Sequence, residues 1–346
     1  MYLLIGTFAI VNRSFMNLRT IIGILTAGLL SMSTLNGQNR PEPKFLFNQR
    51  GIETLSCKAA VQGTAIWKNY LFSMRDTGHC VVIDLKTHKL VAEFPLASAG
   101  VQNHANDAFF AEQRYSPEDK FPLLYVSQCK SQPVVEIDRK EIAGKSRLLF
   151  VERVKTDAKG NPCGTELVQV IEYEPQEWNS RLWAHDSKDP DFMWCYGNIL
   201  GNAKPGNRIV VKKFKMPVFN PDMFLVTLND ADAVQTLYFD EAFPAGARGP
   251  QDNILQGAIV YDGVMYLPVG VGEPDYPSEI FCVDTRHLDS DGKPYLYGAW
   301  NYNDVIPCEM EDMDVWKGQL ICTTNSHGRV RPVYAFPIKK MQLKSR

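Results

Sequence analysis

The sequence predicts an all-β fold, a β-propeller with five blades of four antiparallel strands each. After residue 40 the chain has almost no helical periodicity, and short runs rich in Val, Ile, Leu, Phe and Tyr alternate with turn residues. Three segments align without gaps and therefore indicate an internal repeat: 62–73, 256–267 and 311–322. Repeated small antiparallel sheets are typical of propeller blades.

Each of the three aligned segments predicts two strands joined by a tight hairpin turn. The turns are expected at Lys68–Asn69, Asp262–Gly263 and Lys317–Gly318, because such pairs favour two-residue β-hairpins. A third strand is predicted in three units, ending in Val82–Ile83–Asp84, Glu136–Ile137–Asp138 and Cys282–Val283–Asp284. A fourth strand is expected at 89–94 in the first unit and at 147–151 in the second.

The spacing of the repeat sets the number of blades. Gln62 and Glu311 lie 249 residues apart, which corresponds to four intervals of about 62 residues or five of about 50. Five blades are the main prediction and six the alternative. In the middle of the chain, 166–172, 181–185, 191–196 and 208–214 are grouped as one unit, and an insertion is expected near 218–250.

The last unit lacks a fourth strand after Val333–Phe336. The segment Lys44–Asn48 has strand composition and could supply it. We therefore expect the ring to be closed by an N-terminal strand, which removes an exposed sheet edge.

The N-terminus resembles an export signal. Arg19 precedes a short apolar run, Ile21–Leu30, which is followed by small and polar residues. Residues 1–38 are predicted to be a signal peptide, with Met16 an alternative start, and 39–346 a single propeller domain. The run is shorter than the ~20 residues of a membrane span, so a retained anchor is the lesser alternative. The protein is expected to be exported, to the periplasm or the cell exterior, with no membrane span after cleavage.

Composition excludes some classes of protein. The 346 residues include 37 Lys and Arg against 39 Asp and Glu, a net charge of −2, whereas nucleic-acid binders normally carry a basic excess. The eight cysteines form no CxxC pair, so no zinc site is expected, and buried free thiols are favoured over disulfides. No metal site is predicted, the sequence indicates no particular cofactor, and a monomer is expected.

In a propeller, the starts of the inner strands and the loops after the second strands face one rim. This placement selects the candidate site residues, which are proposed to gather around a central funnel. The candidate catalytic residues are His104 and Glu311, and the candidate ligand-binding residues are Gln62, Arg75, His79, Gln128, His185, Gln256, His327 and Arg329. The structural alternative is that these polar groups bond one another or water in a wet channel.

Two of these side chains have chemistry suited to catalysis. His104 offers a proton donor or acceptor near neutral pH. Glu311 has acidic neighbours in Glu309, Asp312 and Asp314, which indicates a general base or cation ligand, or merely solvated charge at a blade edge. Arg75, Lys130 and Arg329 could bind an anionic group.

The leader, the Gln-Gly strand starts and the Val/Ile-Asp strand ends resemble secreted β-propellers of Bacteroidetes, over residues 44–338. The architecture is similar to that of five-bladed glycoside hydrolases of the arabinanase and invertase type. That likeness implies acidic residues on the inner strands of several blades, including the first, where this chain has Gln62. The resemblance implies the fold and leaves the activity open.

Three functions follow as hypotheses. The first is binding of a small polar ligand, such as a glycan, in the central funnel. The second is a hydrolase or lyase acting on a carbohydrate-type substrate with His104 and Glu311. The third is a scaffold that binds protein partners through its loops.

Overall fold

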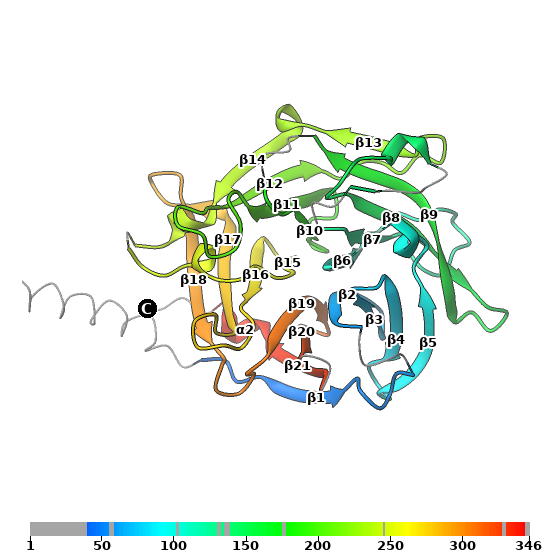
Figure 1. Ribbon diagram of the computed structural model, residues 1–346, viewed down its shortest axis with the longest axis horizontal. Helices are drawn as coiled ribbons and strands as arrows, with labels where there is room; N and C mark the ends of the chain where they lie inside the picture. The colour runs from blue at the N-terminus through cyan, green and yellow to red at the C-terminus, as the bar shows by residue number, and fades with distance from the viewer. Residues whose placement is uncertain are drawn as a thin grey trace, which may run out of the picture. The chain divides into compact units, whose positions relative to one another are not determined.

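The computed structural model describes residues 40–54, 59–101, 104–129, 133–134, 139–174, 178–244, 246–326 and 330–342. Five sheets stand around a central axis, each with its strands in antiparallel order from the axis outward (Figure 1). The predicted five-bladed propeller is confirmed, and the six-bladed alternative is wrong. The predicted leader lies outside the described residues. Within the described ranges, no helix has the length and hydropathy needed to cross a bilayer.

We number the blades in chain order and give their strands from the axis outward. Blade 1 contains β2 (Val61–Trp67), β3 (Tyr70–Arg75), β4 (His79–Asp84) and β5 (Lys89–Pro95). Blade 2 contains β6 (Asp107–Phe110), β7 (Leu124–Ser127), β8 (Leu149–Thr156) and β9 (Pro162–Tyr173), with β13 (Leu225–Leu228) added in parallel at its outer edge. Blade 3 contains β10 (Leu182–His185), β11 (Phe192–Asn198), β12 (Ile209–Lys215) and β14 (Ala233–Tyr238).

Blade 4 contains β15 (Ile259–Tyr261), β16 (Val264–Val269), β17 (Glu279–Leu288) and β18 (Pro294–Asn301). Blade 5 contains β19 (Glu309–Trp316), β20 (Gln319–Asn325), β21 (Pro332–Pro337) and β1 (Lys44–Asn48). The inner strands β2, β6, β10, β15 and β19 contact one another in that order, and β19 contacts β2. The inner strands therefore form a closed ring around the axis.

Short helices link the strands. They are the 3-10 turns η1 (Ala97–Val101), η2 (Lys140–Ile142), η3 (Asp230–Asp232), η4 (Phe239–Ala242) and η5 (Pro250–Asp252), and the terminal helix α2 (Ile338–Met341). None of them lies in an inner strand. The axis is therefore surrounded by the five inner strands and by the loops that follow them.

The three predicted hairpins are confirmed. Lys68, Asp262 and Lys317 occupy equivalent turn positions with φ of 58°, 51° and 49°. Gly263 and Gly318 follow with φ of 70° and 74°, the left-handed backbone that two-residue hairpins require and glycine adopts easily. We call the rim with these turns the hairpin face, and the rim where the inner strands begin the entry face.

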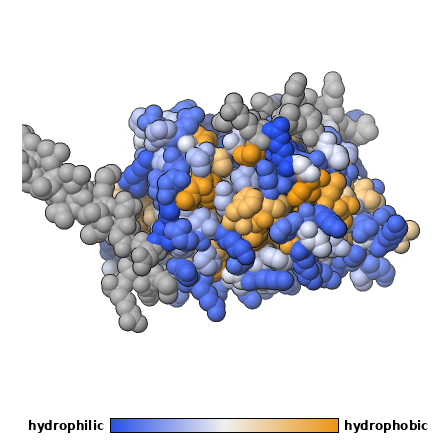
Figure 2. Space-filling model, turned by 90° about the horizontal axis from the view of Figure 1, so that it is seen from below, coloured by the Kyte–Doolittle hydropathy of each residue, from blue (hydrophilic) through white to orange (hydrophobic). Residues whose placement is uncertain are grey.

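The N-terminal strand closes the ring as predicted. β1 pairs antiparallel with β21, from Lys44 opposite Ala335 to Asn48 opposite Pro332. The two ends of the described chain therefore share one blade, and its outer edge lies at the bottom of Figure 1. Seen from that side, small hydrophobic groups lie among polar side chains (Figure 2). Phe45 of β1 is 54% exposed there.

The predicted grouping of strands in the middle of the chain is wrong. Arg147–Val151 was expected to be the fourth strand of its unit, but β8 is the third strand of blade 2, and β9 is the fourth. The candidate third strand ending at Asp138 lies outside the described residues. Residues 218–250 supply β14, the fourth strand of blade 3, and β13, which extends blade 2.

The hydrophobic core lies between neighbouring blades. For example, Phe72 of blade 1 packs edge-to-face on Phe110 of blade 2, with ring centroids 5.0 Å apart. Separate buried clusters fill the other four junctions. Each blade buries both of its faces in this way, and a group of buried polar side chains, among them Gln62, Asp107 and Asp312, lies along the axis.

Candidate functional site

β-Bulges turn polar side chains of three blades toward the axis. In β2 the pairing with β3 shifts by one residue between Val61 and Thr64, and β19 shifts against β20 between Met310 and Asp312. Blade 4 shows the same shift, since Leu255 faces Val269 while Ile259 faces Tyr266. A bulge adds one residue to a strand and redirects its side chains.

Behind the entry face, carboxyl and amide groups form a layer that bonds to itself. Gln62 Nε2 donates to Glu311 at 3.3 Å, and Gln256 Nε2 donates to Glu309 at 2.8 Å. Glu309 lies close enough to Glu311 to disfavour the charged form of its carboxyl group. Burial, together with Glu309, raises the pKa of Glu311 well above its ordinary value. Gln62, Gln256 and Glu311 therefore come together as predicted, in an arrangement that matches the structural alternative.

Below this layer Asp312 joins blade 5 to blades 1 and 2. Its Oδ2 accepts from the backbone N–H of Thr64 at 2.6 Å and of Ala108 at 3.2 Å. Its Oδ1 accepts from Met313 N at 2.7 Å. The side chain is fully buried, so each of these bonds forms away from water.

Asp107 makes the matching connections to blades 3 and 4. Its Oδ2 accepts from the hydroxyl of Tyr196 at 2.5 Å and from Ala258 N at 3.4 Å. Burial raises the pKa of both aspartates well above the ordinary value, and the charge of Asp107 raises that of Asp312 further. Between them the two carboxyl groups contact all five blades.

Two glycines make this close packing possible. A Cβ on Gly63 would lie 2.6 Å from the carbonyl oxygen of Ala105, and one on Gly257 would collide with the carboxylate of Asp312. Their backbone N–H groups donate to Ala105 O and Glu311 O, both at 2.7 Å, in the next blade. The Gln-Gly motif of the repeat is therefore a contact between neighbouring inner strands.

Toward the hairpin face the axis opens into a cavity of about 150 Å³. All five inner strands line it, together with the loops that follow β6 and β10. The lining residues are Ile66, Trp67, Phe109, Phe110, Ala111, Glu112, His185, Ser187, Ile259, Asp314 and Val315. Glu112 and Ser187 are exposed, so the cavity reaches the surface. We call it the axial cavity; by liquid volume it would hold about five waters.

His185 borders this cavity and carries a buried acceptor without a described partner. It is 2% exposed, its ring stacks on Phe109 at 5.4 Å, and it hydrogen-bonds the backbone of Pro190. Proline offers only a carbonyl, so the ring donates there, and buried Nε2 has no partner among the described residues. Burial lowers the pKa of His185, which keeps the imidazole neutral and Nε2 an acceptor.

Asp314 supplies the carboxyl group of the cavity. Its Oδ2 accepts from Ile66 N at 2.5 Å and its Oδ1 from Val315 N at 2.6 Å. Burial nevertheless raises the pKa of Asp314 to about 7, because the two backbone bonds offset only part of the desolvation cost. Near neutral pH this group can therefore gain or lose a proton.

The predicted site residues do not form one group. His185 lies at the end of β10, on the hairpin face and away from Gln62 and Gln256, because β10 is a first strand and was predicted to be a second. His104 is half-buried just before β6. Gln128 is buried and accepts from Leu148 N at 3.2 Å, and His79 bonds Thr77. His327 and Arg329, like Lys130, lie outside the described residues.

Arg75 is a buried structural group. Its guanidinium pairs with Glu53 at 2.5 Å and donates to Gln49 and Ser73. Glu53 also pairs with Arg331, so one carboxylate is held between blades 1 and 5 by two arginines. All three side chains are at most 3% exposed. We call this group the Glu53 clamp.

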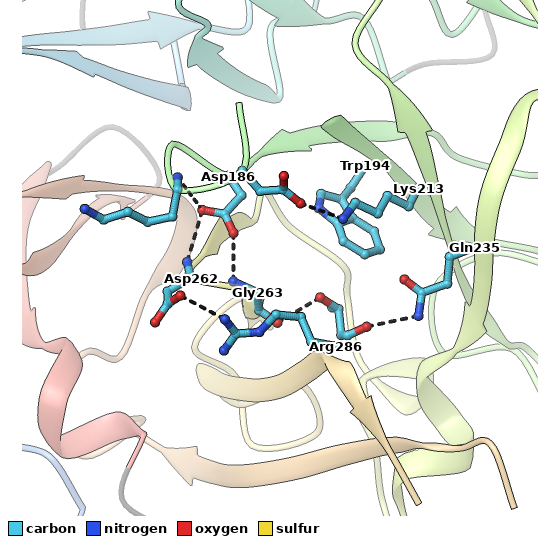
Figure 3. Close-up of a pocket in the computed structure, with 10 residues that line it drawn as sticks. Asp186, Trp194, Lys213, Gln235, Asp262, Gly263 and Arg286 are labelled. Carbon is cyan, nitrogen blue, oxygen red and sulfur yellow. Dashed lines mark hydrogen bonds and ion pairs between the residues drawn. The ribbon is translucent and has the colours of Figure 1, made fainter. Parts of the chain in front are cut away.

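A second cavity, of about 310 Å³, lies between blades 3 and 4 (Figure 3). Asp186 accepts there from the backbone of Asp262 and Gly263, and Gln235 donates to Thr285 O. Lys213 pairs with Asp189 at 2.6 Å and Arg286 with Asp262 at 2.8 Å. Because its wall groups pair with one another, this cavity points to no ligand as clearly as the axial cavity does.

Sequence reasoning missed the role of Asp107 and Asp314. Asp314 was considered only as a neighbour of Glu311, and Asp107 was not among the candidate site residues. The available signal was the run Glu309, Glu311, Asp312, Asp314 on a predicted inner strand, where charge is costly unless it is bonded.

No protein-family model matches this chain, and a search of curated proteins finds no match either.

Proposed function

We propose that this protein is an exported binding protein whose axial cavity takes a small polar ligand, such as a sugar. The observation that carries the proposal is His185 Nε2, a buried acceptor with no described partner, in a cavity lined by every blade. Buried polar atoms are normally bonded, so a ligand that donates a hydrogen bond would complete this one. The predicted signal peptide supports export.

The composition of the cavity suits such a ligand. Trp67, Phe109 and Phe110 give it aromatic walls, while His185 and Asp314 give it polar groups in fixed positions. Sites for small molecules commonly combine apolar walls with a few placed polar groups. A sugar can pack its C–H surface on the aromatic rings and donate hydroxyl hydrogens to the acceptors.

Calorimetric titration of the purified protein with a panel of monosaccharides and small polyols tests the proposal. We expect saturable binding of at least one member. His185→Phe keeps a ring against Phe109 and removes the acceptor, so it should weaken binding about 10- to 100-fold, since a lost buried hydrogen bond costs about 1–3 kcal/mol. His79→Ala on the entry face is the matched control and should bind normally.

Two results would contradict the proposal. One is that no member of the panel binds to the folded wild-type protein. The other is that His185→Phe binds the ligand as tightly as wild type does.

A further inference from the structure

We propose that the axial cavity selects ligands that carry an ammonium group, held between the carboxylate of Asp314 and the imidazole of His185. The inference rests on the proposed function and further specifies that the ligand is positively charged. Three observations lead to it: an excess of carboxyl groups along the axis, aromatic walls, and wall groups that accept hydrogen bonds.

The first observation is the charge along the axis. Five carboxyl groups lie there, on Asp107, Glu309, Glu311, Asp312 and Asp314. Across the described parts of the chain, no lysine, arginine or histidine forms an ion pair with any of the five. Buried charges are normally paired, so these carboxyl groups must either stay protonated or be balanced by a bound cation.

The strands packed most closely against β19 supply no cation to Asp314. They are β2, β6, β15, β16 and β20, and their titratable side chains are Asp107, Tyr261, Tyr266 and Cys322. On β19 itself the charged groups are Glu309, Glu311 and Asp312. Glu112 adds a further carboxyl group at the exposed mouth.

Several basic side chains near the hairpin turns lie against aromatic rings, and Lys188 likewise lies 5.7 Å from the centre of the Tyr261 ring. Lys68 and Arg114 lie 5.9 Å and 5.5 Å from the centre of the Trp67 ring. Lys317 lies 4.4 Å from the centre of the Trp316 ring. The charged groups that line the cavity are therefore the carboxyl groups of Glu112, at its mouth, and Asp314.

The second observation is the aromatic wall. Trp67, Phe109 and Phe110 line the cavity beside Asp314. Tyr125 and His185 stack on Phe109, and Lys68 and Arg114 already lie over the Trp67 ring. The wall therefore supplies apolar contact to any ligand, and the preference for a cation comes from the carboxylate of Asp314.

The third observation is that the polar wall accepts hydrogen bonds. His185 Nε2 is an acceptor, and each Asp314 oxygen, already bonded once to a backbone N–H, retains a further lone pair. An ammonium group supplies donors only and matches this set. A metal ion fits less well, because no three His, Cys, Asp or Glu side chains of the described residues are placed to hold one.

Protonation adds a signature that a cation would produce most strongly. The pKa of Asp314 is raised to about 7, so its carboxyl group is mostly protonated below this pH. A cation that binds the carboxylate must then displace this proton. Its affinity should therefore fall about tenfold between pH 8 and pH 6 for one coupled proton. A neutral ligand that donates a hydrogen bond prefers the ionised form less strongly, so its affinity should change less with pH.

The experiment compares ligands of equal shape that differ in charge. The probes are n-butylamine against butan-1-ol, and ethanolamine against ethylene glycol, titrated calorimetrically at pH 8 and pH 6. At pH 8 we expect each cation to bind at least tenfold more tightly than its neutral counterpart. At pH 6 this preference should fall about tenfold.

Two variants locate the effect. Asp314→Asn should remove most of the preference for the cation and its pH dependence. Glu112→Gln, at an exposed position that carries no risk to folding, should reduce the preference about twofold to threefold. Glu118→Gln, an exposed acid outside the cavity, should leave the preference unchanged.

The outcomes separate the two proposals. If neutral sugars or polyols bind but the cations bind no more tightly than their counterparts, the inference is wrong and the proposed function stands. If Asp314→Asn folds and keeps the full preference, the inference is also wrong. If neither the cations nor any member of the sugar panel binds, both proposals fail.

Discussion

Asp107 and Asp312 connect the five blades from the centre of the ring. Asp312 accepts hydrogen bonds from backbone groups of blades 1, 2 and 5, and Asp107 accepts from a hydroxyl of blade 3 and a backbone group of blade 4. Both carboxyl groups are buried, so removing the hydrogen bonds that either one accepts leaves several buried donors without partners.

Asp312→Asn should therefore destabilise the protein by about 2–4 kcal/mol, because the amide nitrogen would face backbone N–H groups that need an acceptor. The midpoint of urea unfolding checks this prediction. Asp275→Asn, at an exposed position, is the control and should lie within about 0.5 kcal/mol of wild type. Equal stabilities for the two variants would show that the carboxyl group of Asp312 does not hold the blades together.

Stability should depend on pH through Asp314. Burial raises its pKa from 3.8 to about 7, so the folded state holds a proton that the unfolded state has already released. The free energy of unfolding should fall as pH rises from about 4 to 7, by about 4 kcal/mol from this group, since one pKa unit is worth about 1.4 kcal/mol.

Urea unfolding at several pH values between 4 and 8 measures this slope. Asp314→Asn should reduce the fall by about 4 kcal/mol, because the amide does not titrate, and should leave the contribution of Asp107, Glu311 and Asp312, whose pKa values are also raised. Equal slopes for wild type and Asp314→Asn would contradict the assignment.

Gly257→Ala should be strongly destabilising, by about 2 kcal/mol or more, because the added methyl group collides with the Asp312 carboxylate across the blade junction. Gly164→Ala is a matched control: a Cβ there meets nothing within 4 Å, and its φ is not in the left-handed region. Thermal unfolding of both variants decides the point. A Gly257→Ala protein as stable as the control would mean that the strands separate easily.

The Glu53 clamp should contribute to stability and not to binding at the rim. Glu53→Gln leaves Arg75 and Arg331 buried without a counter-charge and should cost about 3–5 kcal/mol. Glu42→Gln, an exposed acid near Arg40, should cost little. Chemical unfolding compares the two, and a small loss for Glu53→Gln would show that the arginines find other partners.

The repeat predicted blades 1, 4 and 5 well, because their hairpins carry turn residues with clear backbone requirements. It failed between 128 and 215. A strand pattern shows that a strand exists but not which strand it pairs with, so one misassigned strand displaced every later one in this region. β14 is also hard to recognise, since only one of its six residues is fully buried.

The same displacement explains the errors at the site. His185 was assigned to the wrong rim because its strand was counted as a second strand. Gln62, Gln256 and Glu311 were grouped correctly because the repeat alignment fixes their positions. The direction of the Asp312 and Asp314 side chains depends on the bulge in β19, which no pattern of residue types reveals.

The pairing of β1 with β21 has a consequence for how the protein reaches its native state. The strand that is made first has no partner until the last blade has left the ribosome, so the ring cannot close while the chain is still growing. Folding should therefore end at this junction, and unfolding should begin there. An unpaired β1 would also leave a free edge on which a second molecule could pair.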